Sequence, residues 1–258
     1  MTKERNGARY GALWTREESI LAFELYCRIP FQRTTANNPA VKELARLIGR
    51  TPASVARRLG NFGALDPELR QKAISGLTHT SKLDKQVWEE FHADWNELVW
   101  MANQIRENLR LGSQTAPSLT QPSGPSEILR MTKQRAHQGF FRDAVLSSYA
   151  TTCCVTGLTI PECLIASHIV PWSENERYRT DPTNGLCLSA TFDRLFDTGL
   201  MTVTPELVVR FSPRIADSKN SIVEDLLCRY RGQPIRRPER FLPAAQHLVW
   251  HQQNRFKH

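Results

Sequence analysis

The sequence predicts an α+β protein with a helical domain over residues 1–110 and a second domain, over residues 127–258, built on a strand–strand–helix element. Three observations support this division. Capped helical segments with an apolar face fill the first domain. Residues 111–126 carry no charge and are rich in Ser, Pro, Gly and Thr, a composition typical of a flexible linker. Two short strand-like segments and a capped helix lie between residues 164 and 199.

The first predicted helix follows Trp14. Thr15 is a favourable N-cap, and Glu18 stands three residues later, as in a capping box. The apolar face of this helix is then supplied by Ile20, Leu21, Phe23, Leu25 and Tyr26.

Two further helices are predicted around a glycine turn. Residues 39–47 form a helix that ends at Gly49, and Thr51 caps the next helix, which has Pro52 at its first position. A helix, a short turn and a capped helix are typical of a helix-turn-helix unit. Its last helix is expected to expose side chains suited to base edges and phosphates in a major groove: Ser54, Arg57, Arg58 and Asn61. The alternative is an ordinary helical hairpin with a solvated basic face.

The second domain places a histidine at the end of a strand. Residues 164–166 are strand-like, and Pro171 prevents the strand from continuing far beyond His168. Asn184-Gly185 is a turn signal, and residues 186–188 form a second short strand. Ser189 then begins a helix that is expected to end at Gly199.

Two carboxylates lie on one face of that helix. Asp193 and Asp197 are four residues apart, so both can reach one ion. Like charges at this spacing disfavour a helix, and the dipole disfavours an anion in the last turn. A divalent cation would compensate for both effects. The alternative is a pair of solvated acids.

These segments resemble the HNH family of nucleases, and the resemblance covers roughly residues 130 to 255. The lead-in helix matches at Arg135, Gln138, Phe141 and Arg142, and the closing motif matches at residues 248–251. The central motifs lie at Cys154 to Gly157, Ala166 to Trp172, Asn184 to Leu186 and Asp193 to Leu200.

The resemblance implies a two-stranded hairpin and a helix around one metal ion. His168 would be the general base, a task that suits an imidazole. Asn184 would hold the hairpin loop and orient His168. Asp193 and Asp197 would hold Mg²⁺ or Mn²⁺, which prefer oxygen ligands. Arg142 and Arg194 would contact phosphates nearby.

Two positions depart from the commonest form of the family. Ser167 stands where many members have aspartate or histidine, and Asp193 stands where many have histidine. An all-oxygen helix pair favours magnesium over zinc or nickel.

The first domain resembles the recognition domains of McrA-like, modification-dependent restriction endonucleases. The resemblance rests on the Trp14 helix, on Phe31 and on residues 47–62. A reader of a methylated base needs an apolar or aromatic pocket. Such a pocket would be lined by Trp14, Tyr26, Phe31 and Phe62. The alternative is that these aromatic residues belong to the core.

Composition narrows the partners and the compartment. A formal charge of +8 and a pI near 9.4 favour a polyanionic partner, here double-stranded DNA. Five C-terminal arginines, at positions 229, 231, 236, 237 and 240, form either a phosphate-contacting flank or a solvated tail. The chain shows no signal peptide and no long apolar run, so no membrane partner and a cytoplasmic location are expected.

The six cysteines include no C-x-x-C pair, so no structural zinc is expected. The alternative is a zinc site built from Cys153 or Cys154 together with Cys163 and Cys187.

Together these features predict an HNH endonuclease of modified DNA that hydrolyses phosphodiesters to 5′-phosphate and 3′-hydroxyl ends. A homodimer would let two single-strand cuts make a double-strand break. The alternative function is a DNA-binding protein in which an inactive HNH module serves as a scaffold.

Overall fold

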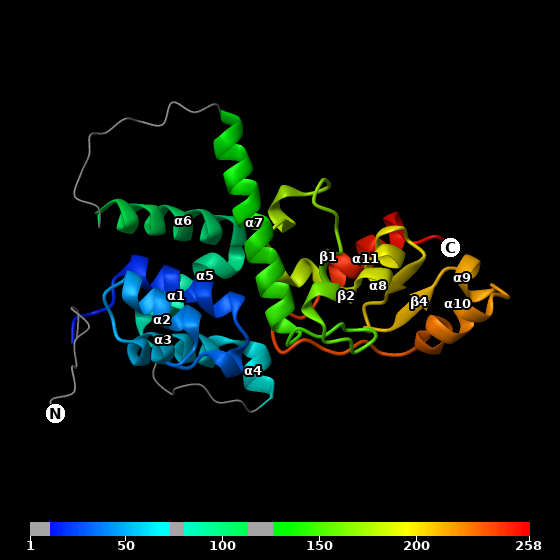
Figure 1. Ribbon diagram of the computed structural model, residues 1–258, viewed down its shortest axis with the longest axis horizontal. Helices are drawn as coiled ribbons and strands as arrows, with labels where there is room; N and C mark the ends of the chain where they lie inside the picture. Colours follow the sequence, from blue (N-terminus) through cyan, green and yellow to red (C-terminus); the bar gives the residue numbers. More distant parts are fainter. Residues whose placement is uncertain (1–10, 73–79, 113–125) are drawn as a thin grey trace. The chain divides into compact units, whose positions relative to one another are not determined.

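The structure is a computed structural model that describes residues 11–72, 80–112 and 126–258 (Figure 1). The chain divides into two compact units, Met1–Phe140 and Phe141–His258. The first unit therefore extends beyond residue 110, where the helical domain was expected to end. Phe140 explains part of this difference, because its ring lies 6.3 Å from that of Trp95. Most of the expected linker, residues 113–125, lies outside the described residues.

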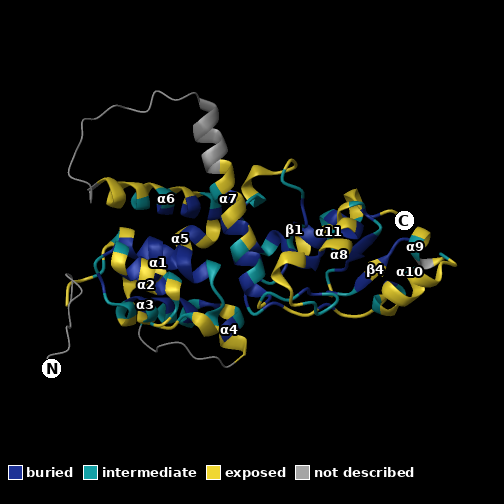
Figure 2. Ribbon diagram, in the orientation of Figure 1, coloured by how far each residue is buried: buried dark blue, intermediate teal, exposed yellow. Residues whose placement is uncertain are grey.

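The first unit is helical and is organised around α1 (Arg16–Arg28). The middle of α1 is buried from Glu18 to Cys27 (Figure 2), and α1 packs against α2, α3, α5 and α6. The other elements are η1 (Phe31–Arg33), α2 (Pro39–Leu47), α3 (Pro52–Leu65), α4 (Pro67–Gln71), α5 (Lys82–Ala93) and α6 (Trp95–Gly112).

The helix starts predicted in this unit are confirmed. Thr15 and Glu18 form both hydrogen bonds of the capping box, and Thr51 accepts a hydrogen bond from the Ser54 amide. Gly49, in the turn between α2 and α3, has φ +69°, a conformation that glycine adopts without steric cost.

The second unit contains the predicted strand–strand–helix element. Helix α7 (Ser126–Ser148) leads into it, and the antiparallel strands β1 (Leu164–His168) and β2 (Gly185–Ser189) pair with His168 opposite Gly185. Helix α8 (Ala190–Asp197) follows β2 directly and packs on both strands. Short 3-10 turns connect these elements: η2 (Pro161–Cys163), η3 (Glu176–Tyr178) and η4 (Pro182–Asn184).

The rest of this unit follows α8 in the sequence, and its first strand packs against α8. A second hairpin, β3 (Met201–Val203) and β4 (Val209–Phe211), precedes α9 (Pro213–Ala216), α10 (Ser221–Leu226), η5 (Cys228–Tyr230) and α11 (Ala245–Asn254). Gly199 ends α8 as predicted, with φ +72°. A Cβ at Gly199 would lie 1.9 Å from the Arg255 carbonyl oxygen, so the segment after α11 requires glycine there.

His251 fastens α11 to this element. Its ring stacks on Phe196 at 3.7 Å, its Nε2 hydrogen donates to the Phe196 carbonyl, and its Nδ1 accepts from the Thr202 hydroxyl. Burial lowers the pKa of His251 to about 4, so the imidazole is neutral at pH 7.

The α+β class is therefore confirmed: helices predominate, with two small antiparallel sheets. Across the ranges that the structure describes, no helix combines the length and the apolar character that crossing a membrane demands.

Candidate functional site

The hairpin and α8 position the predicted site residues of the second unit. His168 is the last residue of β1, and Asp193 and Asp197 lie on α8. Successive residues of a strand face opposite sides. Ser167 and His168 follow this alternation. The Ser167 hydroxyl acts on the pKa of Asp193, whereas the His168 ring contacts Phe141 of α7.

His168 is held on three sides. Its ring stacks on Phe141 with centroids 3.6 Å apart and planes 8° apart, and the Trp172 ring meets it edge-on at 5.7 Å. The His168 Nε2 lies 3.1 Å from the carbonyl oxygen of Arg179. A carbonyl only accepts, so Nε2 carries the hydrogen and, in the neutral ring, Nδ1 keeps a free lone pair.

The surroundings keep this imidazole neutral. Burial lowers the pKa of His168, and the hydrogen bond to the Arg179 carbonyl partly opposes that effect. A base must be unprotonated before it can accept a proton, so the direction of the shift favours general-base chemistry near neutral pH.

Asn184 clamps the loop between the two strands. The side chain is fully buried; its Oδ1 accepts from the Val170 amide, and its Nδ2 donates to the carbonyls of Val170 and Tyr178. The Ile169 amide also donates to the Asn184 carbonyl. These bonds fix the chain on both sides of the loop that contacts His168.

Asp193 and Asp197 form a close carboxylate pair. Partial burial raises the pKa of Asp193, and the Ser167 hydroxyl and the Arg194 guanidinium oppose the increase. Partial burial and then the negative charge of Asp193 raise the pKa of Asp197, while Arg255 and Arg194 oppose it. A carboxylate whose pKa is raised by the charge of a neighbouring carboxylate marks a favourable place for a cation.

The donor set fits a hard divalent cation. The Ser167 hydroxyl is buried beside this pair and makes no hydrogen bond of ordinary geometry with the described residues. Among the residues that the structure describes, no group of three or more His, Cys, Asp or Glu side chains is arranged to hold a metal ion. Magnesium commonly uses only one or two carboxylates, with water and phosphate oxygens as its other ligands. Asp193 and Asp197 would supply that number.

The arginines near this pair have different surroundings. Arg194 is exposed on α8 and influences both carboxylates. Arg142, by contrast, donates to the carbonyls of Leu164 and Pro161, which ties α7 to the start of β1. Sequence reasoning missed Arg255, which lies near Asp197 through the fold of the C-terminus and has no motif that marks it.

The face predicted for α3 is only partly exposed. Arg57 is exposed, and Ser54 and Asn61 are half-buried. The prediction that Arg58 is exposed is wrong: the residue is 7% exposed, forms an ion pair with Asp84 of α5, and stacks on the Trp14 ring at 4.3 Å.

Asp84 explains why the polar face of α3 turns inward. It is fully buried, and it accepts hydrogen bonds from both Arg58 and Asn61. A buried carboxylate needs such partners, and the sequence pattern of α3 alone does not reveal a partner on another helix. Arg58 and Asn61, which were expected to contact DNA, therefore hold α5 to α3.

The aromatic residues expected to line a base pocket have separate environments. Tyr26 and Phe62 are fully buried in the core, where the Tyr26 hydroxyl donates to Asp66 at 2.8 Å. Trp14 is half-buried, and the guanidinium carbons of Arg50 and Arg58 lie 4.5 and 4.3 Å from the centre of its ring. For Tyr26 and Phe62, the structure matches the core alternative.

Phe31 packs close to the backbone of α3. It meets the Tyr26 ring edge-on, and a Cβ added to Gly63 would lie 2.1 Å from its ring. Gly63 therefore makes room for Phe31, which again places this aromatic side chain against the helical core.

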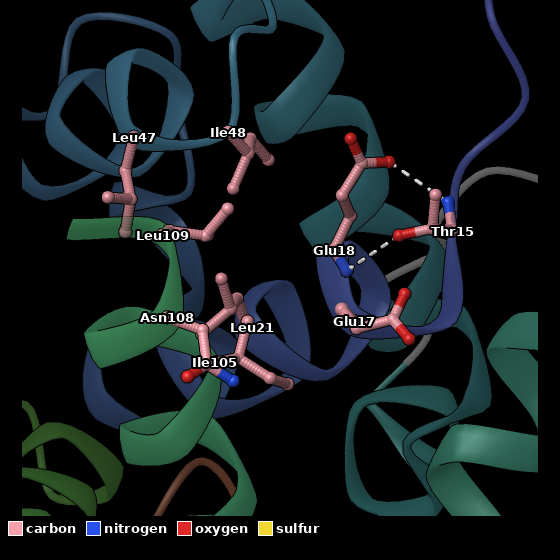
Figure 3. A pocket seen from close by; sticks show the side chains of 9 residues that line it. All are labelled: Thr15, Glu17, Glu18, Leu21, Leu47, Ile48, Ile105, Asn108 and Leu109. Carbon is pink, nitrogen blue, oxygen red and sulfur yellow. Dashed lines mark hydrogen bonds between the residues drawn. The ribbon is translucent and has the colours of Figure 1, made fainter. Parts of the chain in front are cut away.

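A cavity in the first unit lies elsewhere. It has a volume of about 470 Å³ and lies between the start of α1, the end of α2 and the last part of α6 (Figure 3). None of the four aromatic residues predicted to line a base pocket belongs to this cavity. Its lining mixes polar and apolar side chains: Thr15, Glu17, Glu18, Leu21, Leu47, Ile48, Ile105, Asn108 and Leu109.

Three of the cysteines considered for a zinc site lie in the core of the second unit. Cys153, Cys154 and Cys187 are buried, whereas Cys163 is exposed. Burial raises the pKa of the Cys187 thiol to about 12 and that of Cys154 well above its usual value. These thiols are protonated at neutral pH, which is the state of packed core cysteines.

The comparisons with known proteins concern the same segment. No curated protein matches the chain at a significant level. Residues 153–204, which contain β1, β2 and α8, match the family model described as HNH endonuclease. The match supports an HNH endonuclease domain in this part of the chain.

Proposed function

We propose that this protein is a metal-dependent endonuclease that hydrolyses phosphodiester bonds of double-stranded DNA. The observation that carries the proposal is the carboxylate pair, Asp193 and Asp197, on the helix that directly follows the hairpin bearing His168. The family match over residues 153–204 supports the same chemistry.

His168 would act as the general base. Its Nδ1 lone pair would take a proton from a water molecule as the water oxygen forms a bond to phosphorus. The bond between phosphorus and the 3′ oxygen breaks, and the leaving oxygen takes a proton from solvent. The products are a 5′-phosphate and a 3′-hydroxyl.

The carboxylates would hold the cation, and Arg194, exposed beside them, would contact a phosphate. When bound, a divalent cation stabilises negative charge on the scissile phosphate and on the leaving 3′ oxygen. Mg²⁺ or Mn²⁺ suits a pair of oxygen donors. Asn184 would act indirectly, by holding the loop that contacts His168.

We further propose restriction of modified DNA as the role, with the helical unit as the reader. This part rests on the sequence resemblance of the helical unit. Arg57 is the predicted DNA contact that remains exposed on α3, with Ser54 and Asn61 half-buried beside it.

Matched supercoiled plasmids test both parts. One plasmid is unmodified and the other carries 5-methylcytosine, and each is incubated with Mg²⁺, with Mn²⁺ or with EDTA. His168→Ala and Asp193→Ala should each lower cleavage by a factor of about 100 or more. Asp225→Ala serves as the matched control, because Asp225 is an exposed carboxylate on α10.

The outcomes separate the two parts of the proposal. Metal-dependent cleavage of the methylated plasmid alone supports both. Equal cleavage of the two plasmids keeps the nuclease and removes the methyl reader. Binding of DNA with no cleavage in any metal refutes the nuclease and leaves the DNA-binding scaffold.

A further inference from the structure

The loop between β1 and β2 contains an arginine whose backbone and side chain both act on the surroundings of His168. Arg179 lies directly after η3, and its carbonyl accepts the Nε2 hydrogen of His168 at 3.1 Å. This carbonyl can select a tautomer only if its position is fixed, because loop backbone is otherwise the most mobile part of a fold.

The side chain of Arg179 turns back across the same loop. Its Nε donates to the Trp172 carbonyl at 3.0 Å, and its guanidinium carbon lies 5.1 Å from the centre of the Trp172 ring. A planar guanidinium can donate in its plane and stack on a ring, which an ammonium group cannot do in the same way. Arg179 therefore closes the loop onto Trp172.

Trp172 completes the enclosure of the histidine. Its ring meets the His168 ring edge-on at 5.7 Å, on a side that Phe141 does not cover by stacking. The same loop is held at Val170 and Tyr178 by Asn184, but none of the Asn184 bonds reaches the Arg179 carbonyl. Arg179 thus fixes the part of the loop that Asn184 leaves free.

The ion pair of Arg179 is a minor part of this arrangement. Its Nη1 lies 2.9 Å from Glu176, but the Glu176 side chain is 83% exposed. Exposed ion pairs contribute little because water and salt screen them. The stacking and the Nε hydrogen bond remain as the contacts that position the loop.

We propose that Arg179 is a positioning residue that clamps the loop between residues 172 and 179 and thereby holds His168 as the tautomer with a hydrogen on Nε2 and a basic Nδ1. The inference rests on the proposed function for its catalytic meaning, but the tautomer can be measured without any cleavage. Arg179 links the carbonyl that accepts from His168 to both the backbone and the ring of Trp172.

The first test is the tautomer of His168 in the full-length protein. Long-range ¹H–¹⁵N spectra of ¹⁵N-histidine-labelled protein distinguish the two neutral tautomers, and His168→Ala assigns the signal. The wild type should show a single tautomer protonated at Nε2. Arg179→Ala should show a mixture of both, whereas Arg214→Ala, an exposed arginine on α9, should keep the wild-type signal.

Two conservative changes separate the clamp from its charge. Arg179→Lys keeps the positive charge but loses the Nε bond and the planar stacking, so it should resemble Arg179→Ala. Glu176→Gln removes the exposed ion pair and should leave the His168 tautomer unchanged. A wild-type tautomer in both Arg179 variants, or rescue by lysine, would overturn the proposal.

Plasmid cleavage then gives the catalytic readout. At saturating DNA and metal, both Arg179 variants should lower kcat by roughly 10- to 100-fold, the range expected when a reacting group moves by up to about 1 Å, with KM little changed. A wild type that binds but does not cleave DNA refutes the nuclease and leaves the tautomer result standing. An altered tautomer with unchanged kcat refutes the positioning role.

Discussion

Gly185 offers a sharp test of how the second unit packs around His168. It faces His168 across the hairpin, and its φ of −126° is one that alanine adopts readily. An added Cβ would lie 2.3 Å from Val145 Cγ2, 3.1 Å from Phe141 Cζ and 3.2 Å from the Pro182 carbonyl oxygen. Gly185→Ala therefore adds a steric conflict and no backbone strain.

The conflict should be costly because neither side can move alone. Val145 and Phe141 belong to α7, while Gly185 begins β2 and is paired with His168 of β1. Overpacking of this kind costs about 1–3 kcal/mol of unfolding free energy. At about 4 °C for each kcal/mol, Tm should fall by about 4–12 °C. The Phe141 ring stacks on His168, so cleavage should also slow by roughly 10-fold or more.

The matched control is Gly139→Ala. Gly139 also lies in α7, but a Cβ added there meets no atom within 4 Å. In a helix, alanine is more stable than glycine by about 0.5–1 kcal/mol. Thermal and urea unfolding of both variants, read with the cleavage rate, give the comparison. Equal Tm values for Gly185→Ala and Gly139→Ala would refute the packing argument.

Four other outcomes can be measured on the same protein. The acid limb of the kcat profile at saturating metal should have its midpoint below pH 6.5, because burial lowers the pKa of His168 and the base works only when neutral; a midpoint above that value would contradict this assignment. The pKa of His251 is about 4 in the folded protein and 6.5 in the unfolded chain, so the unfolded chain binds a proton first as the pH falls. The free energy of unfolding should therefore fall by up to about 3 kcal/mol between pH 6.5 and pH 4. Urea unfolding across this range should show this slope, and His251→Gln should flatten it. Asp84→Ala leaves the Arg58 charge buried without its partner and should cost about 3–5 kcal/mol. Arg57→Ala should change stability by less than about 0.5 kcal/mol and reduce the salt slope of DNA binding by about one, as filter binding would show.

Local structure was predictable wherever neighbouring residues decide it. The capping box at Thr15, the start of α3 at Thr51 and the end of α8 at Gly199 follow from short-range rules of hydrogen bonding and backbone conformation. His168 at the end of a strand followed from the apolar run before it and from Pro171 after it. These features need no knowledge of distant contacts.

Gly185 shows how a correct local prediction can have a different cause. Asn184-Gly185 suggested a tight turn, but η4 ends at Asn184, Gly185 begins β2 and its φ is not left-handed. The residue is glycine because α7, some forty positions away in the sequence, packs against it. Short-range rules detected the glycine and assigned it the wrong reason.

The polar faces show where sequence reasoning failed. Periodicity placed Arg58 on the surface of α3, because a helical pattern reports only which residues share a face. The tertiary fold supplies Asp84 from α5 and Trp14 from the chain before α1, and these partners compensate for the cost of burying a guanidinium. Tyr26 and Phe62 were similarly assigned to a pocket and lie in the core.

The sequence by itself determined the α+β class, the capped helices, the hairpin and the identity of the carboxylate pair, because each depends on spacing within a few residues. Only the tertiary structure decided which nitrogen of His168 carries the hydrogen, that Arg179 and Trp172 enclose it, and that Arg255 lies near Asp197. Those contacts join residues through loops and chain ends, where position is set by packing and not by the periodicity of any one element.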